Sequence, residues 1–202
     1  QIRCLFEDIE IHAVKIGMVA DIALIEAVAE ALEQVVRPPV VLDPVMISKS
    51  GYALLKEDAQ AALIARLFPL AEVVTPNIFE AERLVGHAVT STDEMEDAAR
   101  EMLALGARKA VVKGGHLGGS EATDILYDGQ RFQWLTSPRT DTPNTHGTGC
   151  TFSSAIAANL PLGYPFFEAV SRAKTYISGA IRHALAIGRG HGPTHHFFDL
   201  YA

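Results

Sequence analysis

The segment Asn-Thr-His-Gly-Thr-Gly-Cys-Thr at residues 144–151 is the part of the chain whose residue types most directly suggest chemistry. Gly147 and Gly149 allow a tight turn whose backbone N–H groups can point at one place, and the apolar run that follows predicts a helix starting there. This combination predicts an anion hole suited to a phosphoryl group under transfer. Cys150 lies in or beside the first helical turn, where a thiolate forms more readily and could accept a proton from a substrate hydroxyl group. The alternative is a glycine-rich turn with a buried cysteine that only packs, and spacing alone does not decide between the two.

Two other phosphate-binding motifs are missing from the sequence. It contains no Gly-x-x-x-x-Gly-Lys-Ser/Thr segment, and the glycines at 114, 115, 118 and 119 form neither that motif nor Gly-x-Gly-x-x-Gly. The sequence therefore disfavours a P-loop nucleotidase and a dinucleotide-dependent oxidoreductase.

Short apolar runs and longer amphipathic stretches alternate along the chain. This order is typical of a parallel sheet with helices on both faces, so the expected fold is α/β, a three-layer αβα sandwich. Asp128-Gly129 between two alternating stretches predicts a β-hairpin, which adds an antiparallel piece at one end. Ligands bind outside the carboxyl ends of strands in such sheets, which is where Met18, Asp43, Asn77 and Lys113 fall. The expected strands are 13–17, 40–42, 72–75, 109–113, 122–127 and 131–135, and the expected helices are 21–35, 57–67, 77–85, 92–105, 148–159 and 165–187.

The composition limits the classes of partner. The 202 residues are 49% apolar and 20% charged, which suits a folded chain with a sizeable core, and we expect one domain over residues 1–202. The net charge is −7 and there is no basic run, so neither nucleic acid nor a membrane surface is expected as a partner. Cys4 and Cys150 are too few and too far apart for a disulfide framework, which favours a cytoplasmic location.

Six segments of the sequence resemble, in the same order, the ribokinase-like superfamily in the variant of the hydroxymethylpyrimidine/phosphomethylpyrimidine kinases of thiamine biosynthesis. Most members of the superfamily have Asp at the position of Cys150, so the cysteine points to this variant. The resemblance covers essentially the whole chain and implies a ribokinase-like fold. The six segments are Lys15-Ile16-Gly17-Met18, Asp43-Pro44-Val45-Met46, Thr75-Pro76-Asn77 with Glu80, Val112-Lys113-Gly114-Gly115-His116, His146-Gly147-Thr148-Gly149-Cys150 and Gly190-His191-Gly192-Pro193.

The resemblance implies a kinase that uses ATP and Mg²⁺ and forms a homodimer. It would phosphorylate 4-amino-5-hydroxymethyl-2-methylpyrimidine and then the resulting monophosphate. The N–H groups of Gly147, Gly149 and Cys150 would face the γ-phosphoryl group, and Cys150 would also be the base at the hydroxymethyl group. Met18 and Val45 would line the pyrimidine pocket. The implied ATP-binding residues are Asn77, Glu80, Lys113, Thr148 and Asp43, of which Glu80, through water, and Asp43 would also serve the metal.

Most of these residues also have an ordinary structural interpretation. Glu80 could be a solvated helix residue, Asp43 part of an Asp-Pro turn, and Lys113 a lysine at a strand end. Thr148 could cap its own helix. Met18 and Val45 could be core residues.

The tail at residues 190–196 contains three histidines, which suggest a metal site. No carboxylate or cysteine nearby completes a ligand set, so we expect a structural role for the tail instead.

Members of the family usually carry a further N-terminal βαβ region that binds the pyrimidine, and nothing in this sequence matches it. Without that region we expect the sheet to lack an inner strand, the substrate site to be half complete and the chain to transfer little phosphate. Two other functions stay open. One is pyridoxal kinase of the same superfamily, whose substrate is also a flat heteroaromatic ring with a hydroxymethyl group, and the other is a non-catalytic ligand-binding domain.

Overall fold

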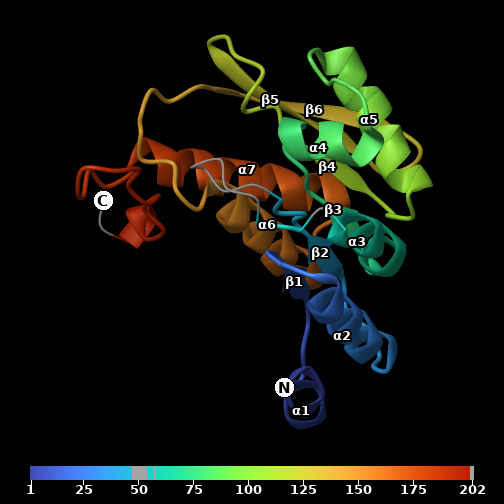
Figure 1. Ribbon diagram of the computed structural model, residues 1–202. Helices are drawn as coiled ribbons and strands as arrows, with labels where there is room; N and C mark the ends of the chain where they lie inside the picture. The colour runs from blue at the N-terminus through green and yellow to red at the C-terminus, as the bar shows by residue number, and fades with distance from the viewer. Residues whose placement is uncertain (47–53, 57, 201–202) are drawn as a thin grey trace.

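Six strands form one hydrogen-bonded sheet in the order in which they occur along the chain (Figure 1). The computed structural model describes residues 1–46, 54–56 and 58–200. The strands are β1 (Val14–Ile16), β2 (Val40–Leu42), β3 (Val73–Val74), β4 (Ala110–Val112), β5 (Glu121–Tyr127) and β6 (Phe132–Pro138). The first four are parallel, with Val14 beside Val40 and Leu42 beside Val74, and β5 and β6 form an antiparallel hairpin next to β4. The predicted mostly parallel sheet is confirmed.

Helices cover both faces of this sheet, as the αβα prediction requires. Along β2, Val40 and Leu42 belong to one apolar cluster and Val41 to another, because successive side chains of a strand point to opposite faces. The first cluster is completed by α2 (Ile22–Glu33), α3 (Ala59–Leu67), α4 (Ile78–Val85) and α5 (Thr92–Ala104), and the second by α6 (Thr148–Asn159) and α7 (Phe166–Arg182) (Figure 1).

Local sequence signals explain where several helices begin and end. Asp21 accepts a hydrogen bond from the Leu24 N–H and starts α2, and Ser91 forms a capping box with Glu94 at the start of α5. Gly86 ends α4 in the left-handed region, with φ 81°. These caps fix where the three helices begin or end.

The remaining elements are short. α1 (Ile2–Asp8) contacts α2 and contributes no buried residue. The 3₁₀ turns are η1 (Phe68–Leu70), η2 (Leu160–Leu162) and η3 (Phe198–Leu200). Over residues 1–46, 54–56 and 58–200, no helix is both long and apolar enough to cross a bilayer.

The structure corrects three details of the sequence prediction. The last long helix ends at Arg182 rather than 187, the second hairpin strand continues to Pro138, and α1 was not predicted. The helix expected from residue 57 is described from Ala59, and residue 57 itself lies outside the described residues. Within the described residues β1 to β6 pair without a gap, and β1 lies at one edge of this sheet.

Candidate active site

Asp43 follows β2 and is the centre of a buried polar cluster at the carboxyl edge of the sheet. Its side chain is 2% exposed, and the Nζ atom of Lys113, which follows β4, lies 2.9 Å from its Oδ1 atom. The hydroxyl groups of Thr75 and Ser153 donate to Oδ1 and Oδ2, each at 3.3 Å. The Val45 N–H donates a hydrogen bond to the Asp43 carbonyl at 2.8 Å, so the Asp-Pro turn considered from the sequence is present. The Asp43 side chain has a further role, because it accepts the three hydrogen bonds just described. The cluster joins the ends of three strands to α6.

Lys113 carries a positive charge that the site stabilises. Burial would lower the pKa of the Lys113 ammonium group, but the carboxylates of Asp43 and Glu80 outweigh burial and raise this pKa above its ordinary value. A fixed cation at the end of a central strand can bind an anionic ligand there.

Asn77 and Glu80 form a capping box at the start of α4. The Asn77 Oδ1 atom accepts a hydrogen bond from the Glu80 N–H at 3.0 Å, and the Glu80 Oε2 atom accepts one from the Asn77 N–H at 2.8 Å. Glu80 is 4% exposed, so the interpretation as a solvated helix residue is wrong. Burial raises the pKa of Glu80, although Lys113 and the N–H groups of Asn77 and Met46 favour the charged form. A buried carboxyl group whose pKa is perturbed beside a charge partner is a candidate functional residue.

The first turn of α6 packs directly on the Asp43–Lys113 pair. Gly147 precedes the helix with φ 82°, a backbone conformation that favours glycine. Gly149 is the second helical residue, and a Cβ atom built on it would stand 3.3 Å from Lys113 Nζ and 3.8 Å from Asp43 Oδ2. The absence of a side chain at Gly149 therefore permits the close approach of helix and cation.

Thr148 and Cys150 flank Gly149 in this turn. The Thr148 hydroxyl group donates to the Thr145 carbonyl at 2.8 Å, and α6 begins without a side-chain cap, so Thr148 does not cap its own helix. Cys150 is the third helical residue and is exposed, so the interpretation as a buried packing cysteine is wrong. The predicted position in the first helical turn is confirmed.

The C-terminal tail holds the loop that precedes α6. The His146 N–H donates to the Gly192 carbonyl at 3.0 Å, and the Gly192 N–H donates to the Oδ1 atom of the buried Asn144 at 3.0 Å. The His191 ring contacts a backbone carbonyl of the same loop at 3.1 Å. Within the part of the chain that the structure describes, no group of three His, Cys, Asp or Glu residues could hold a metal ion. The hydrogen bonds between the tail and this loop agree with the structural role expected for the tail.

Met18 and Val45, the expected substrate-binding residues, follow β1 and β2 at the same edge of the sheet as Asp43. Met18 is 58% exposed and Val45 is half-buried, so neither is a core residue. An exposed methionine beside a polar cluster is available to contact a flat apolar ring.

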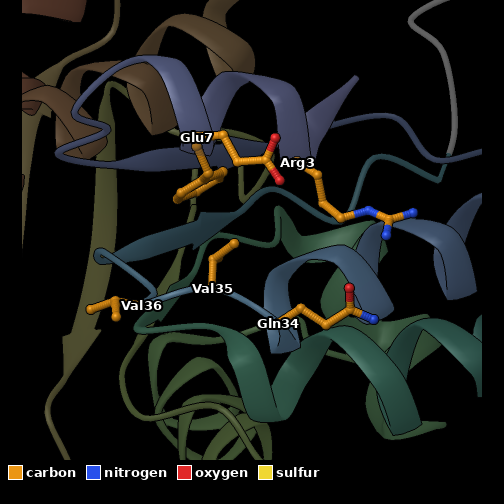
Figure 2. A pocket seen from close by; sticks show the side chains of 6 residues that line it. Arg3, Glu7, Gln34, Val35 and Val36 are labelled. Atoms are coloured by element: carbon orange, nitrogen blue, oxygen red, sulfur yellow. The ribbon is translucent and has the colours of Figure 1, made fainter.

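Two open hollows lie elsewhere on the surface. One of about 440 Å³ is framed by α1 and the turn after α2 (Figure 2), and its lining consists of Arg3, Phe6, Glu7, Gln34, Val35 and Val36. The other, of about 540 Å³, lies at the end of α4 around Gly86. Neither is lined by residues of the Asp43 cluster, so the chemistry of the strand ends, rather than the depth of a hollow, identifies the candidate site.

The sequence reasoning missed three partners of Asp43, namely Lys15, Thr75 and Ser153. The Lys15 Nζ atom lies 3.9 Å from Asp43 Oδ2. A lysine within an apolar parallel strand is unusual, and that signal could have singled it out. The spacing Asn-x-x-Glu at Asn77 was a further signal, because it is typical of a capping box.

The donor set fits a phosphate ligand with Mg²⁺. Asp43 and Glu80 supply oxygen atoms, and Mg²⁺ is usually held by one or two carboxylates together with substrate phosphates and water. Lys113 and the N-terminal turn of α6 supply the cation and the N–H groups that a phosphoryl group needs, and the absence of a side chain at Gly149 leaves space for the Lys113 ammonium group beside this turn. The Asp43 oxygens already accept three hydrogen bonds, so Glu80 is the better metal ligand of the two.

Comparisons with known proteins agree with this chemistry. A sequence model of the phosphomethylpyrimidine kinase family matches residues 1–195. The chain is 50% identical over 200 residues to a hydroxymethylpyrimidine/phosphomethylpyrimidine kinase of Rhizobium meliloti, covering 98% of this chain and 75% of the relative. It is also 50% identical over 196 residues to the thiamine biosynthesis bifunctional protein ThiED of Geobacter sulfurreducens, of which it spans only 40%.

Solved structures give the same fold. The chain is similar to an ADP complex of Bacillus subtilis pyridoxal kinase, with a TM-score of 0.91, 37% identity, and coverage of 100% of this chain and 75% of that one. It is also similar to phosphomethylpyrimidine kinase from Clostridium difficile, with a TM-score of 0.78, 45% identity, and coverage of 89% and 73%. The nearer sequences are pyrimidine kinases, whereas the pyridoxal kinase has the higher TM-score.

Proposed function

Because this chain belongs to the phosphomethylpyrimidine kinase family, we propose that it transfers the γ-phosphoryl group of ATP to the hydroxymethyl group of 4-amino-5-hydroxymethyl-2-methylpyrimidine. A second transfer then converts the monophosphate to the diphosphate, as a step of thiamine biosynthesis. The observation that carries the proposal is the contact of Gly149 with the Lys113–Asp43 pair, because it puts a buried cation and a helix N-terminus at one point.

ATP binds along the ends of β3 and β4 in this proposal. Lys113 contacts the phosphates, and Asn77 and the Thr148 hydroxyl lie at the entrances to α4 and α6 beside them. Glu80, through water, and Asp43 hold Mg²⁺, which neutralises charge on the phosphates. The N–H groups of Gly147, Gly149 and Cys150 then face the phosphoryl group as it moves.

Cys150 is the base for the first transfer. The oxygen of the hydroxymethyl group forms a bond to the γ-phosphorus, the bond to the ADP oxygen breaks, and the hydroxyl proton passes to the Cys150 thiolate. The exposed place of Cys150 in the first turn of α6 supports this role, because the group can reach a substrate at the sheet edge. Met18 and Val45 hold the pyrimidine ring. The family resemblance also supports a cytoplasmic homodimer, with residues 1–202 as one domain.

A direct assay separates this function from its competitors. The full-length protein, including any segment that precedes this chain, is incubated with ATP and Mg²⁺ and with the pyrimidine, its monophosphate or pyridoxal, and ADP and the phosphorylated products are quantified. We expect transfer to both pyrimidines and slower transfer to pyridoxal. Faster transfer to pyridoxal would establish the pyridoxal kinase instead, and binding of ATP without any transfer would establish a ligand-binding domain.

A matched pair of lysine variants ties the activity to the site. Lys113→Met removes the cation beside Asp43, and we expect both transfers to fall by about 10²-fold or more. Lys109→Met is the control, because Lys109 pairs with Glu72 just before β4, at the opposite end of the strand. Equal effects of the two variants would contradict the placement of the phosphates at Lys113.

A further inference from the structure

Asp43 lies between two lysines, and the proposed function uses only one of them. Lys113 approaches Oδ1 at 2.9 Å, whereas the Nζ atom of Lys15 lies 3.9 Å from Oδ2. A Cβ atom built on Gly17 would stand 2.5 Å from the same Nζ atom, so the Lys15 side chain runs along β1 toward the carboxyl end of the strand. Its side chain is 21% exposed and is therefore still open to a ligand.

Lys15 is not needed to satisfy Asp43. The carboxylate already receives hydrogen bonds from Lys113, Thr75 and Ser153, and 3.9 Å exceeds the length of a hydrogen bond to Lys15. The carboxylates of Asp43 and Glu80 both act on Lys113, whereas the ion pair that the described residues give Lys15 is the longer one, at 3.9 Å from Asp43. A partly buried ammonium group held at that distance can still accept an anionic ligand.

The order of the strands places the two lysines on different halves of the site. Lys113 follows β4, next to the Asn77 and Glu80 turn after β3, which is the proposed nucleotide half. Lys15 lies on β1, the strand that leads to Met18, which is the proposed acceptor half. Asp43, between them, keeps the two cations apart.

The two transfers differ in the charge of the acceptor. The hydroxymethyl acceptor is neutral, but the monophosphate acceptor carries a dianionic phosphate, whose second pKa is near 6, and this phosphate must approach the anionic γ-phosphoryl group. In the second transfer an oxygen of that phosphate forms the bond to the γ-phosphorus and the bond to ADP breaks. An ionised phosphate releases no proton in this step. The second transfer therefore needs a cation on the acceptor half, rather than a base.

We propose that Lys15 binds the phosphate of the monophosphate acceptor and so makes the second transfer possible. The proposal rests on the proposed function and deepens it, because it assigns one residue to one of the two acceptors. Lys113 serves the nucleotide in both transfers, whereas Lys15 distinguishes an acceptor that carries a phosphate from one that does not.

The test compares both transfers in the same preparations of wild type, Lys15→Met and Lys15→Arg. In Lys15→Met we expect kcat/KM for the monophosphate to fall about 10–100-fold, mainly through KM, because a charge-assisted hydrogen bond to phosphate is lost. For the unphosphorylated pyrimidine we expect kcat/KM to stay within about threefold. Lys15→Arg keeps the charge and should retain most of the second transfer.

Each outcome has a distinct meaning. Absence of both transfers in the wild type would refute the proposed function itself. If the wild type is active, equal losses of both transfers in Lys15→Met would show that Lys15 only orients Asp43. An unchanged second transfer would show that Lys15 does not bind the acceptor. Either result overturns the proposal. If Lys15→Met does not fold, as its melting temperature would reveal, the Lys15→Arg and Lys15→Gln pair decides the question by the ratio of the two transfers.

Discussion

At the scale of single residues, the roles proposed for Cys150 and Lys15 are complementary, because only the first acceptor has a proton to lose. Cys150→Ala should lower the first transfer by about 10²–10⁴-fold, the usual weight of general-base catalysis, and the second by less than about tenfold. Cys150→Asp supplies a carboxylate in the same place and should recover part of the first transfer. Cys4→Ala, in the exposed cysteine of α1, is the control. Equal losses of both transfers in Cys150→Ala would contradict the assignment of Cys150 as the base.

Glu80 should show a conflict between stability and activity. Burial raises its pKa above the unfolded value, so the folded protein gains stability as the pH falls through the folded pKa toward about 4.5, and above that window the charged side chain is unfavourable. Glu80→Gln keeps an oxygen for the Asn77 N–H and removes the charge. At neutral pH its melting temperature should therefore equal or exceed that of wild type, and this advantage should shrink as the pH falls.

The same variant should need more Mg²⁺ for half-maximal activity, because a metal ligand is lost. Titration of the rate with Mg²⁺ measures this, with Glu82→Gln on the same helix as the control. If Glu80→Gln is less stable than wild type and needs no more Mg²⁺, Glu80 caps α4 and does not bind the metal.

At the scale of elements, alanine substitutions of the two glycines that flank Thr148 should have different effects on activity and stability. Gly149→Ala puts a Cβ atom 3.3 Å from Lys113 Nζ but keeps a helical conformation, so activity should fall about 10²-fold with no loss of melting temperature. Gly147→Ala meets no atom within 4 Å but strains a residue at φ 82°, at about 1–2 kcal/mol of stability. Gly163→Ala, at φ 88° and also in open space, reports that strain alone. Unchanged turnover in Gly149→Ala would refute the anion hole.

The helices and strands were mostly predictable from the sequence, but some of their ends and the contacts between them were not. Apolar runs and caps such as Asp21 are local signals, so strands and helices were found within a few residues. Helix α7 was extended too far because residues 183–187 are apolar enough to continue a helical pattern. Lys15 was missed as a partner of Asp43 because the sequence does not say how far a long side chain reaches along its strand.

At the scale of the whole molecule, the strands lie in the sheet in the same order as in the sequence. Residues that follow successive parallel strands therefore lie in that order along one edge of the sheet. In the proposed function, Met18 and Val45, which contact the acceptor, follow β1 and β2, whereas Asn77 and Lys113, which contact the nucleotide, follow β3 and β4, so the two substrates would meet over Asp43. The sequence predicted which residues gather at the carboxyl edge, because that is a property of parallel sheets. It did not predict that β1 forms an edge, because the pairing of strands distant in the chain depends on tertiary packing.

One buried ion pair connects the α7 layer to this edge. Lys174 on α7 lies 2.7 Å from the Oδ2 atom of Asp124 on β5, and the Oδ1 atom accepts a hydrogen bond from the N–H of Gly114, the residue after Lys113. Both side chains are nearly buried, at 13% and 7% exposed. Lys174→Met leaves the Asp124 carboxylate without its cation, so the free energy of unfolding in urea should fall by about 3–5 kcal/mol.

Asp124→Asn combined with Lys174→Met should recover much of that loss, because an amide oxygen still accepts the Gly114 N–H and no buried charge remains. Arg172→Met on the same helix is the control, since its pair with Glu168 is half-exposed and should contribute about 1 kcal/mol or less. If Lys174→Met changes the unfolding free energy no more than Arg172→Met, the ion pair does not fasten α7 to the sheet. If the double variant is stable but transfers less phosphate, the pair also holds Gly114, and through it Lys113, in the position that the phosphates require.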